Sequence, residues 1–137
     1  MIVLSNTTSQ TLTTNQSVMF NTVVSRSGCN ECHMANSSSV KLKSPGTYMV
    51  VFNANVTGAT AEAPVQLAVN LGGETIPYST GIYTPAAANA VGQITIILPL
   101  KQCCCDFDRV TVTNTGTNPI IISANPTFYI KKIGGNC

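Results

Sequence analysis

The sequence predicts a single all-β domain, built as a two-sheet antiparallel sandwich of the jelly-roll kind. Val and Ile together number 24 against 7 Leu, and β-branched side chains fit a pleated, half-buried strand. Thr (18), Asn (13) and Ser (11) far outnumber the 12 charged residues, a composition unsuited to a helical bundle. The chain has 137 residues, of which 44% are apolar, so it can form one core and is not disordered.

Short apolar segments alternate with turn signals from residue 17 to the end of the chain. The expected strands are Ser17–Ser25, Val40–Lys43, Tyr48–Val56, Val65–Leu71, Glu74–Pro77, Ala90–Leu100, Arg109–Asn114, Ile120–Ala124 and Thr127–Ile133. Pro45-Gly46 precedes the third of these strands, and Gly72-Gly73 has the spacing of a two-residue hairpin turn. Cys29–Ser39 and Tyr78–Asn89 lack periodicity and are expected to be loops. Regularly spaced short strands of this kind are typical of a sandwich or jelly roll.

The inward-facing positions of these strands give the expected core. We expect twelve apolar or aromatic residues to pack in the subunit core or in a contact between subunits. They are Phe20, Tyr48, Val50, Phe52, Leu67, Val69, Ile96, Leu98, Val110, Val112, Phe128 and Ile130.

Residues 1–16 differ from the rest of the chain, which forms the domain at 17–137. They are mostly Ser, Thr, Asn and Gln, and the apolar side chains among them are Ile2, Val3, Leu4 and Leu12. A segment of this composition is either a frayed terminus or an arm that adds as a strand to the sheet of a neighbouring subunit. We expect an extended N-terminal arm, in which these four side chains support assembly.

Four segments resemble the jelly roll of the tumour-necrosis-factor and complement type. They are the Pro-Gly-x-Tyr turn at 45–48 with its apolar strand, residues 70–77, residues 110–116 and residues 128–133. In bacteria this fold forms the C-terminal domain of collagen-like spore-surface glycoproteins (BclA type), and related domains occur in phage fibres. The resemblance covers residues 17–133.

This resemblance implies a compact homotrimer that packs along a three-fold axis and serves as a structural or adhesive head, without enzymatic activity. The chain departs from the family because it has no Gly-X-Y stalk and carries six cysteines. We therefore expect a self-assembling subunit of a surface fibre, first of all a spore appendage of the exosporium. Its partners would be copies of itself and an anchor or tip protein. The alternative is a trimeric receptor-binding head of a phage fibre or spore filament, with the Tyr78–Asn89 loop on the ligand.

The cysteines allow three interpretations. Cys29, Cys32 and His33 match the spacing of covalent haem attachment, but that pattern normally lies on a helix that packs against the haem. The same residues with one thiol of Cys103–Cys105 would supply four zinc ligands, although only half of such a site is local in sequence. We prefer disulfides to either, and expect no cofactor and no metal.

The disulfide candidates are Cys29, Cys32, Cys103, Cys104, Cys105 and Cys137. Within an extended run of three residues, the middle side chain faces away from the outer two. One face of the run can then pair within the subunit and the other with a neighbour, while Cys137 follows the flexible Gly134-Gly135. Such cross-links would make an assembly resistant to dissociation.

Other functions find little support in the sequence. The net charge of +2 comes without a basic stripe and without Trp, which argues against nucleic-acid binding, and no apolar run is long enough to insert into a membrane. His33 is the single histidine, so a Ser-His-Asp triad would have to be built around that one position. Asp106 and Asp108 have a spacing that suits Ca²⁺ or acid–base chemistry, but such pairs are more often solvated strand ends. The sequence therefore predicts no catalytic residues.

Overall fold

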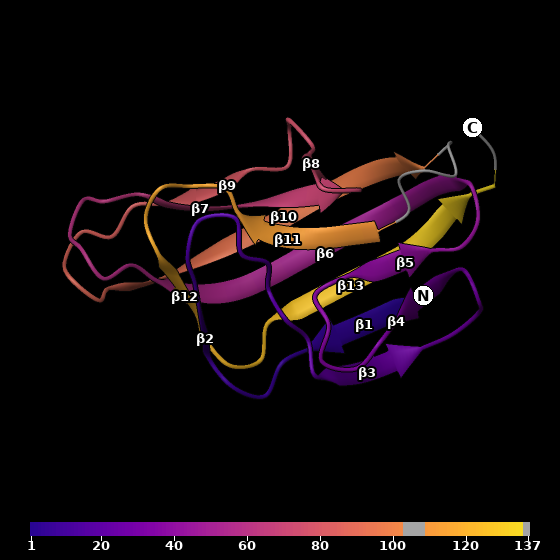
Figure 1. The fold of residues 1–137 in the computed structure, drawn as a ribbon, viewed down its shortest axis with the longest axis horizontal. Helices are drawn as coiled ribbons and strands as arrows, with labels where there is room; N and C mark the ends of the chain where they lie inside the picture. Colours follow the sequence, from indigo (N-terminus) through magenta and orange to yellow (C-terminus); the bar gives the residue numbers. More distant parts are fainter. Residues whose placement is uncertain (103–108, 136–137) are drawn as a thin grey trace.

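Two antiparallel sheets pack face to face in the computed structural model, which describes residues 1–102 and 109–135 (Figure 1). The seven-stranded sheet contains β1 (Ile2–Ser5), β2 (Gln10–Leu12), β3 (Thr22–Arg26), β6 (Gly46–Thr57), β10 (Val91–Gln102), β12 (Ile120–Ile122) and β13 (Thr127–Gly134). The six-stranded sheet contains β4 (Glu31–His33), β5 (Val40–Leu42), β7 (Val65–Leu71), β8 (Glu74–Thr75), β9 (Gly81–Tyr83) and β11 (Arg109–Asn114). Within these residues no helix is long and apolar enough to cross a membrane. The predicted all-β, two-sheet antiparallel architecture is confirmed.

Strand β6 organises the larger sheet. It pairs along its whole length with β10, and its other edge pairs with β13 and then with β12. The turn before it requires glycine, because Gly46 has a φ of 151° and a Cβ there would meet the carbonyl oxygen of Gly134. The Tyr48 hydroxyl donates a hydrogen bond of 2.7 Å to the Ser44 carbonyl and so closes the same turn. These contacts explain the Pro-Gly-x-Tyr pattern.

The core lies between the two sheets and contains every predicted core residue. All twelve side chains are at most 5% exposed. At its centre, the rings of Phe20 and Phe128 stack with centroids 5.1 Å apart, and Phe52 meets Phe128 edge-on at 6.1 Å. Because all twelve are inward-facing, a contact between subunits has to use other residues.

The N-terminal segment is part of this domain, and the prediction of a separate arm at residues 1–16 is wrong. Strand β1 pairs with β13 on one edge and with β3 on the other, and β2 pairs with β12. Ile2 and Leu4 are fully buried, Leu12 is 4% exposed, and Val3 is half-buried on the opposite face of β1. The strand went unrecognised because four residues are too few to show a period, and its partner β13 lies at the far end of the sequence.

Three other segments differ from the prediction. The loops expected at 29–39 and 78–89 contain β4 and β9, each three residues long. The strand expected at Ser17–Ser25 begins at Thr22, and Val18 and Phe20 reach the core from irregular backbone that forms only isolated bridges. Short strands of this kind depend on pairing with distant partners, so local sequence does not reveal them.

Candidate functional site

The outward face of the seven-stranded sheet carries large apolar side chains on its longest strands. Along β10, residues alternate strictly between buried and exposed, so that Ile96 and Leu98 enter the core while Ile97 points outward. Ile97 and Val91 are each 66% exposed. Exposed apolar side chains that form a contiguous patch mark an interaction surface more often than isolated ones do.

Strand register aligns four of these side chains in one row. Ile97 of β10 lies opposite Val51 of β6, and Val51 lies opposite Tyr129 of β13. Tyr129 in turn lies opposite Val3 of β1. Directly opposed residues on one face have Cβ atoms about 5 Å apart, so the four form continuous apolar surface across four strands. We call Ile97, Val51, Tyr129 and Val3 the apolar row.

The apolar row has hydrogen-bonded polar side chains on one side and Met49, Pro99 and Lys131 on the other. On one side, Asn53 Oδ1 accepts hydrogen bonds of 2.9 Å from both Thr95 Oγ1 and Gln93 Nε2. On the other side, Met49 lies opposite Pro99 of β10 and Lys131 of β13. Proline is tolerated in β10 because, among the described strands, this edge strand pairs only with β6. Hydroxyls and amides that already bond one another lose less on burial than free charges do. The face is therefore suited to packing against another protein surface.

Sequence reasoning named one member of the apolar row, Val3, as part of the expected N-terminal arm, and missed Val51, Ile97 and Tyr129. Val51 and Ile97 are direct neighbours of the predicted core positions Val50, Phe52 and Ile96. The two-residue period of a strand therefore assigns both side chains to the outward face, where no role is predicted for them. The available signal was the unbroken apolar run, since a strand exposed to water on one face alternates apolar with polar residues.

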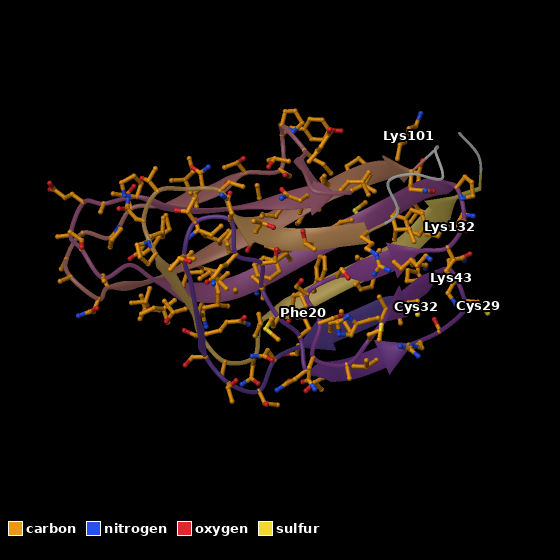
Figure 2. All side chains as sticks on the ribbon, viewed as in Figure 1. Phe20, Cys29, Cys32, Lys43, Lys101 and Lys132 are labelled. Carbon is orange, nitrogen blue, oxygen red and sulfur yellow. The ribbon has the colours of Figure 1, made fainter. Side chains whose placement is uncertain are left out.

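The predicted cysteine and histidine cluster lies on and before β4. Figure 2 shows Cys29 and Cys32 in the same half of the molecule as Lys43, Lys101 and Lys132, at the right of the view. Cys29 is exposed, Cys32 is half-buried, and both thiols are free. Cys32 lies opposite Lys41 of β5 in the strand register.

His33 has a structural role on the inward side of β4. Its side chain is 7% exposed, Nδ1 lies 2.9 Å from the Ser39 carbonyl oxygen, and Nε2 lies 3.0 Å from the Phe20 carbonyl oxygen. A neutral imidazole can donate to one of these carbonyls and an imidazolium to both. With both ring nitrogens facing backbone oxygens, His33 presents no nitrogen toward a metal. This geometry disfavours the zinc and haem interpretations.

Glu31, two residues before His33, is the buried carboxylate of the same strand. Its Oε1 accepts a hydrogen bond of 3.0 Å from the Lys132 amide, and its Oε2 lies 2.8 Å from the N-terminal ammonium group of Met1. The Glu31 side chain is 1% exposed, so these partners replace the water that it loses on folding. The contact ties β4 of one sheet to β1 and β13 of the other.

The remaining predicted site residues lie outside the described part of the chain. They are Cys103, Cys104, Cys105, Asp106, Asp108 and Cys137. Among residues 1–102 and 109–135, no three His, Cys, Asp or Glu side chains gather in a way that could hold a metal ion. The disulfide interpretation therefore stays a prediction.

Two solved structures share the fold. The globular domain of zebrafish complement 1qA protein aligns with a TM-score of 0.65 at 12% identity, over 93% of this chain and 94% of that one. The PRD1 vertex protein P5 aligns with a TM-score of 0.50 at 19% identity, over 96% of this chain and 94% of that one. No family model and no curated protein matches the sequence. At these identities the likeness establishes the fold, so the chain is a jelly roll of the tumour-necrosis-factor and complement type.

Proposed function

We propose that this chain is a non-enzymatic structural subunit that assembles with copies of itself through the apolar row. The observation that carries the proposal is the alignment of Ile97, Val51, Tyr129 and Val3 across four adjacent strands, with Ile97 66% exposed. Removal of apolar surface from water is favourable by about 25 cal/mol per Å², before the entropy cost of association is subtracted. Packing the face against a second copy would remove this row from water.

The size of the outward face fits a stable interface. Strands β6 and β10 have 12 residues each, and that length corresponds to about 40 Å at the usual rise per residue. The four strands that carry the row span about 20 Å at the usual strand spacing. The resulting face is on the order of 800 Å², which is the area that each partner contributes to a standard protein–protein interface.

The assembly that we propose is a homotrimer whose copies build a surface fibre, with a spore appendage as the first assignment. The resemblance to the complement type of jelly roll supports the trimer, and the likeness to a complement domain and to a PRD1 vertex protein supports an extracellular or particle-surface setting. Intermolecular disulfides would reinforce the fibre, and the exposure of Cys29 supports this part of the proposal. An anchor or tip protein would complete it.

The test is the oligomeric state of Ile97→Asp, measured by analytical ultracentrifugation over a range of protein concentrations. A carboxylate in the middle of the apolar row should dissociate the assembly, because burying an unpaired charge is strongly unfavourable. Ile82→Asp is the matched control, since Ile82 is 62% exposed on β9 of the other sheet. We expect wild-type protein and Ile82→Asp to assemble, and Ile97→Asp to remain monomeric with an unchanged circular dichroism spectrum.

Two results would overturn the proposal. One is a wild-type chain that stays monomeric at the highest concentration reached. The other is an Ile97→Asp variant that assembles as readily as Ile82→Asp does. Either result would mean that the apolar row is not the contact between copies.

The second candidate function is a discrete receptor-binding or adhesive head. The segment 78–89 favours it, because Tyr78 is 75% exposed and Ile82 is 62% exposed there. Negative-stain electron microscopy of the oxidised full-length protein separates the two functions. Filaments with an axial repeat support the fibre subunit, whereas uniform compact trimers support the head.

A further inference from the structure

An open cavity of about 650 Å³ lies on the six-stranded sheet, above β11 and the β7–β8 turn. Nine described residues line it, and each of them is polar or glycine. Side chains from distant parts of the sequence meet there, among them Ser17, Asn70, Arg109 and Thr111. The volume is in the range of small-molecule sites. Those sites usually have mainly apolar linings, so the polar lining of this cavity sets it apart from most of them. Because the nine described lining residues belong to one chain, ligand binding there does not depend on self-assembly.

Asn70 is a lining residue with a buried, unbonded side-chain oxygen. It is 9% exposed, and its Oδ1 is buried without any hydrogen bond in the described part of the structure. In β7 it lies directly opposite Thr111 of β11, which lines the same cavity. A buried amide oxygen without a partner destabilises a fold by about 1–3 kcal/mol. Because Oδ1 itself is buried, the Asn70 amide has to turn toward the cavity before a ligand can supply the missing hydrogen bond.

A chain of hydroxyl groups continues from this position along the cavity. Thr111 Oγ1 and Thr113 Oγ1 are 3.2 Å apart, and Thr113 Oγ1 is 2.9 Å from Ser17 Oγ. A hydroxyl has one proton to donate and two lone pairs to accept, so each member of the chain can still bond a further polar group. Arg109 adds a guanidinium group, whose Nη1 lies 3.4 Å from Ser39 Oγ. The cavity wall therefore offers both donors and acceptors.

The chemistry of this lining selects one class of ligand. An apolar ligand would find no apolar side chain among the nine described lining residues. Those nine include no carboxylate, imidazole or thiol for a metal ion, and a single cation, Arg109, for an anion. A molecule whose own hydroxyls both donate and accept would match the amide of Asn70 and the hydroxyls of Thr111, Thr113 and Ser17. We propose that the cavity binds a saccharide through its ring hydroxyl groups.

The test is saturation-transfer difference NMR on the full-length protein, which suits a large assembly because it observes the ligand. The probes are glucose, galactose, N-acetylglucosamine and rhamnose, with glucuronic acid to show any contribution of Arg109 to acidic sugars. We expect saturation transfer to at least one neutral sugar. In Asn70→Ala the affinity should fall about tenfold, the change expected from losing one buried hydrogen bond.

Two further variants separate binding from stability. Thr111→Val keeps the shape of the side chain and removes its hydroxyl, so it should also weaken binding. Gln66→Ala is the control on the same strand, because Gln66 bonds Thr115 at 2.8 Å and does not line the cavity. Asn70→Ala should melt at or above the wild-type temperature, since it deletes the unpaired oxygen. A purely structural Asn70 would melt lower when truncated.

The proposal is overturned if none of the five sugars receives saturation. It is equally overturned if Asn70→Ala and Thr111→Val both bind as tightly as Gln66→Ala does. Monomeric Ile97→Asp protein should bind the same sugar as wild type, so a failure of self-assembly and a failure of sugar binding give different results.

Discussion

Replacing Leu4 by Ala tests the unexpected position of the N-terminal strand. Leu4 is fully buried in β1 and lies opposite Phe128, whose ring stacks on Phe20 at the centre of the core. Leu-to-Ala changes at buried sites cost about 2–5 kcal/mol, the higher values where neighbours cannot close the cavity. Because β1 is held between β13 and β3, the backbone around Leu4 has little freedom to collapse. We expect a loss of about 3 kcal/mol, a large fraction of the 5–15 kcal/mol typical of a whole domain.

The measurement is urea denaturation followed by far-ultraviolet circular dichroism, since the chain has no Trp. At a slope of about 2 kcal/mol per M, the midpoint should fall by about 1.5 M. Thr11→Ala is the control, because Thr11 is an exposed residue of β2 in the same N-terminal segment and should change stability by less than about 0.5 kcal/mol. A Leu4→Ala midpoint equal to wild type would refute the packing of β1. In the background of Ile97→Asp, which should be monomeric, a midpoint that still rises with protein concentration would mean that a neighbouring copy supplies the strand.

Three further predictions concern the turn, the buried carboxylate and the thiols. Gly46→Ala should destabilise the protein by about 1–3 kcal/mol, because its Cβ would also lie 2.7 Å from Lys132 Cε, whereas Gly135→Ala meets nothing within 4 Å and should be neutral in thermal melts. Glu31→Ala should cost about 2 kcal/mol in urea titrations, since it leaves the Lys132 amide without its acceptor and removes the ion pair of the N-terminal ammonium, which keeps its hydrogen bond to the Ser27 carbonyl; a loss below about 1 kcal/mol would contradict this account. Oxidised, assembled protein should run above monomer mass on non-reducing gels, and Cys29→Ser should weaken that band; a peptide map with all six thiols free would exclude disulfide reinforcement.

The strands that sequence analysis located best share a physical property. β6, β7, β10, β11 and β13 each have at least six residues, so the two-residue period of a strand repeats several times in the local sequence. The bounds predicted for β7 and β11 agree with the structure. By contrast β1, β2, β4 and β9 have three or four residues, and their stability comes from pairing with strands far away in the sequence. His33 lies on one of these short strands, so local sequence does not show that its ring is hydrogen-bonded to the backbone carbonyls of Ser39 and Phe20. The sequence alone therefore leaves His33 as a candidate metal or haem ligand.

Local sequence is enough to determine the class of fold and the inward face of each long strand, because burial repeats with the period of the backbone. The register between strands arises only on folding, since it depends on which distant segments pair. That register sets Val3 of the first strand beside Tyr129 of the last, and so creates the apolar row. It likewise sets Asn70 beside Thr111 at the cavity wall, where the amide lacks a partner. Both candidate sites are therefore properties of the paired sheets, since each joins residues that no local pattern of the sequence connects.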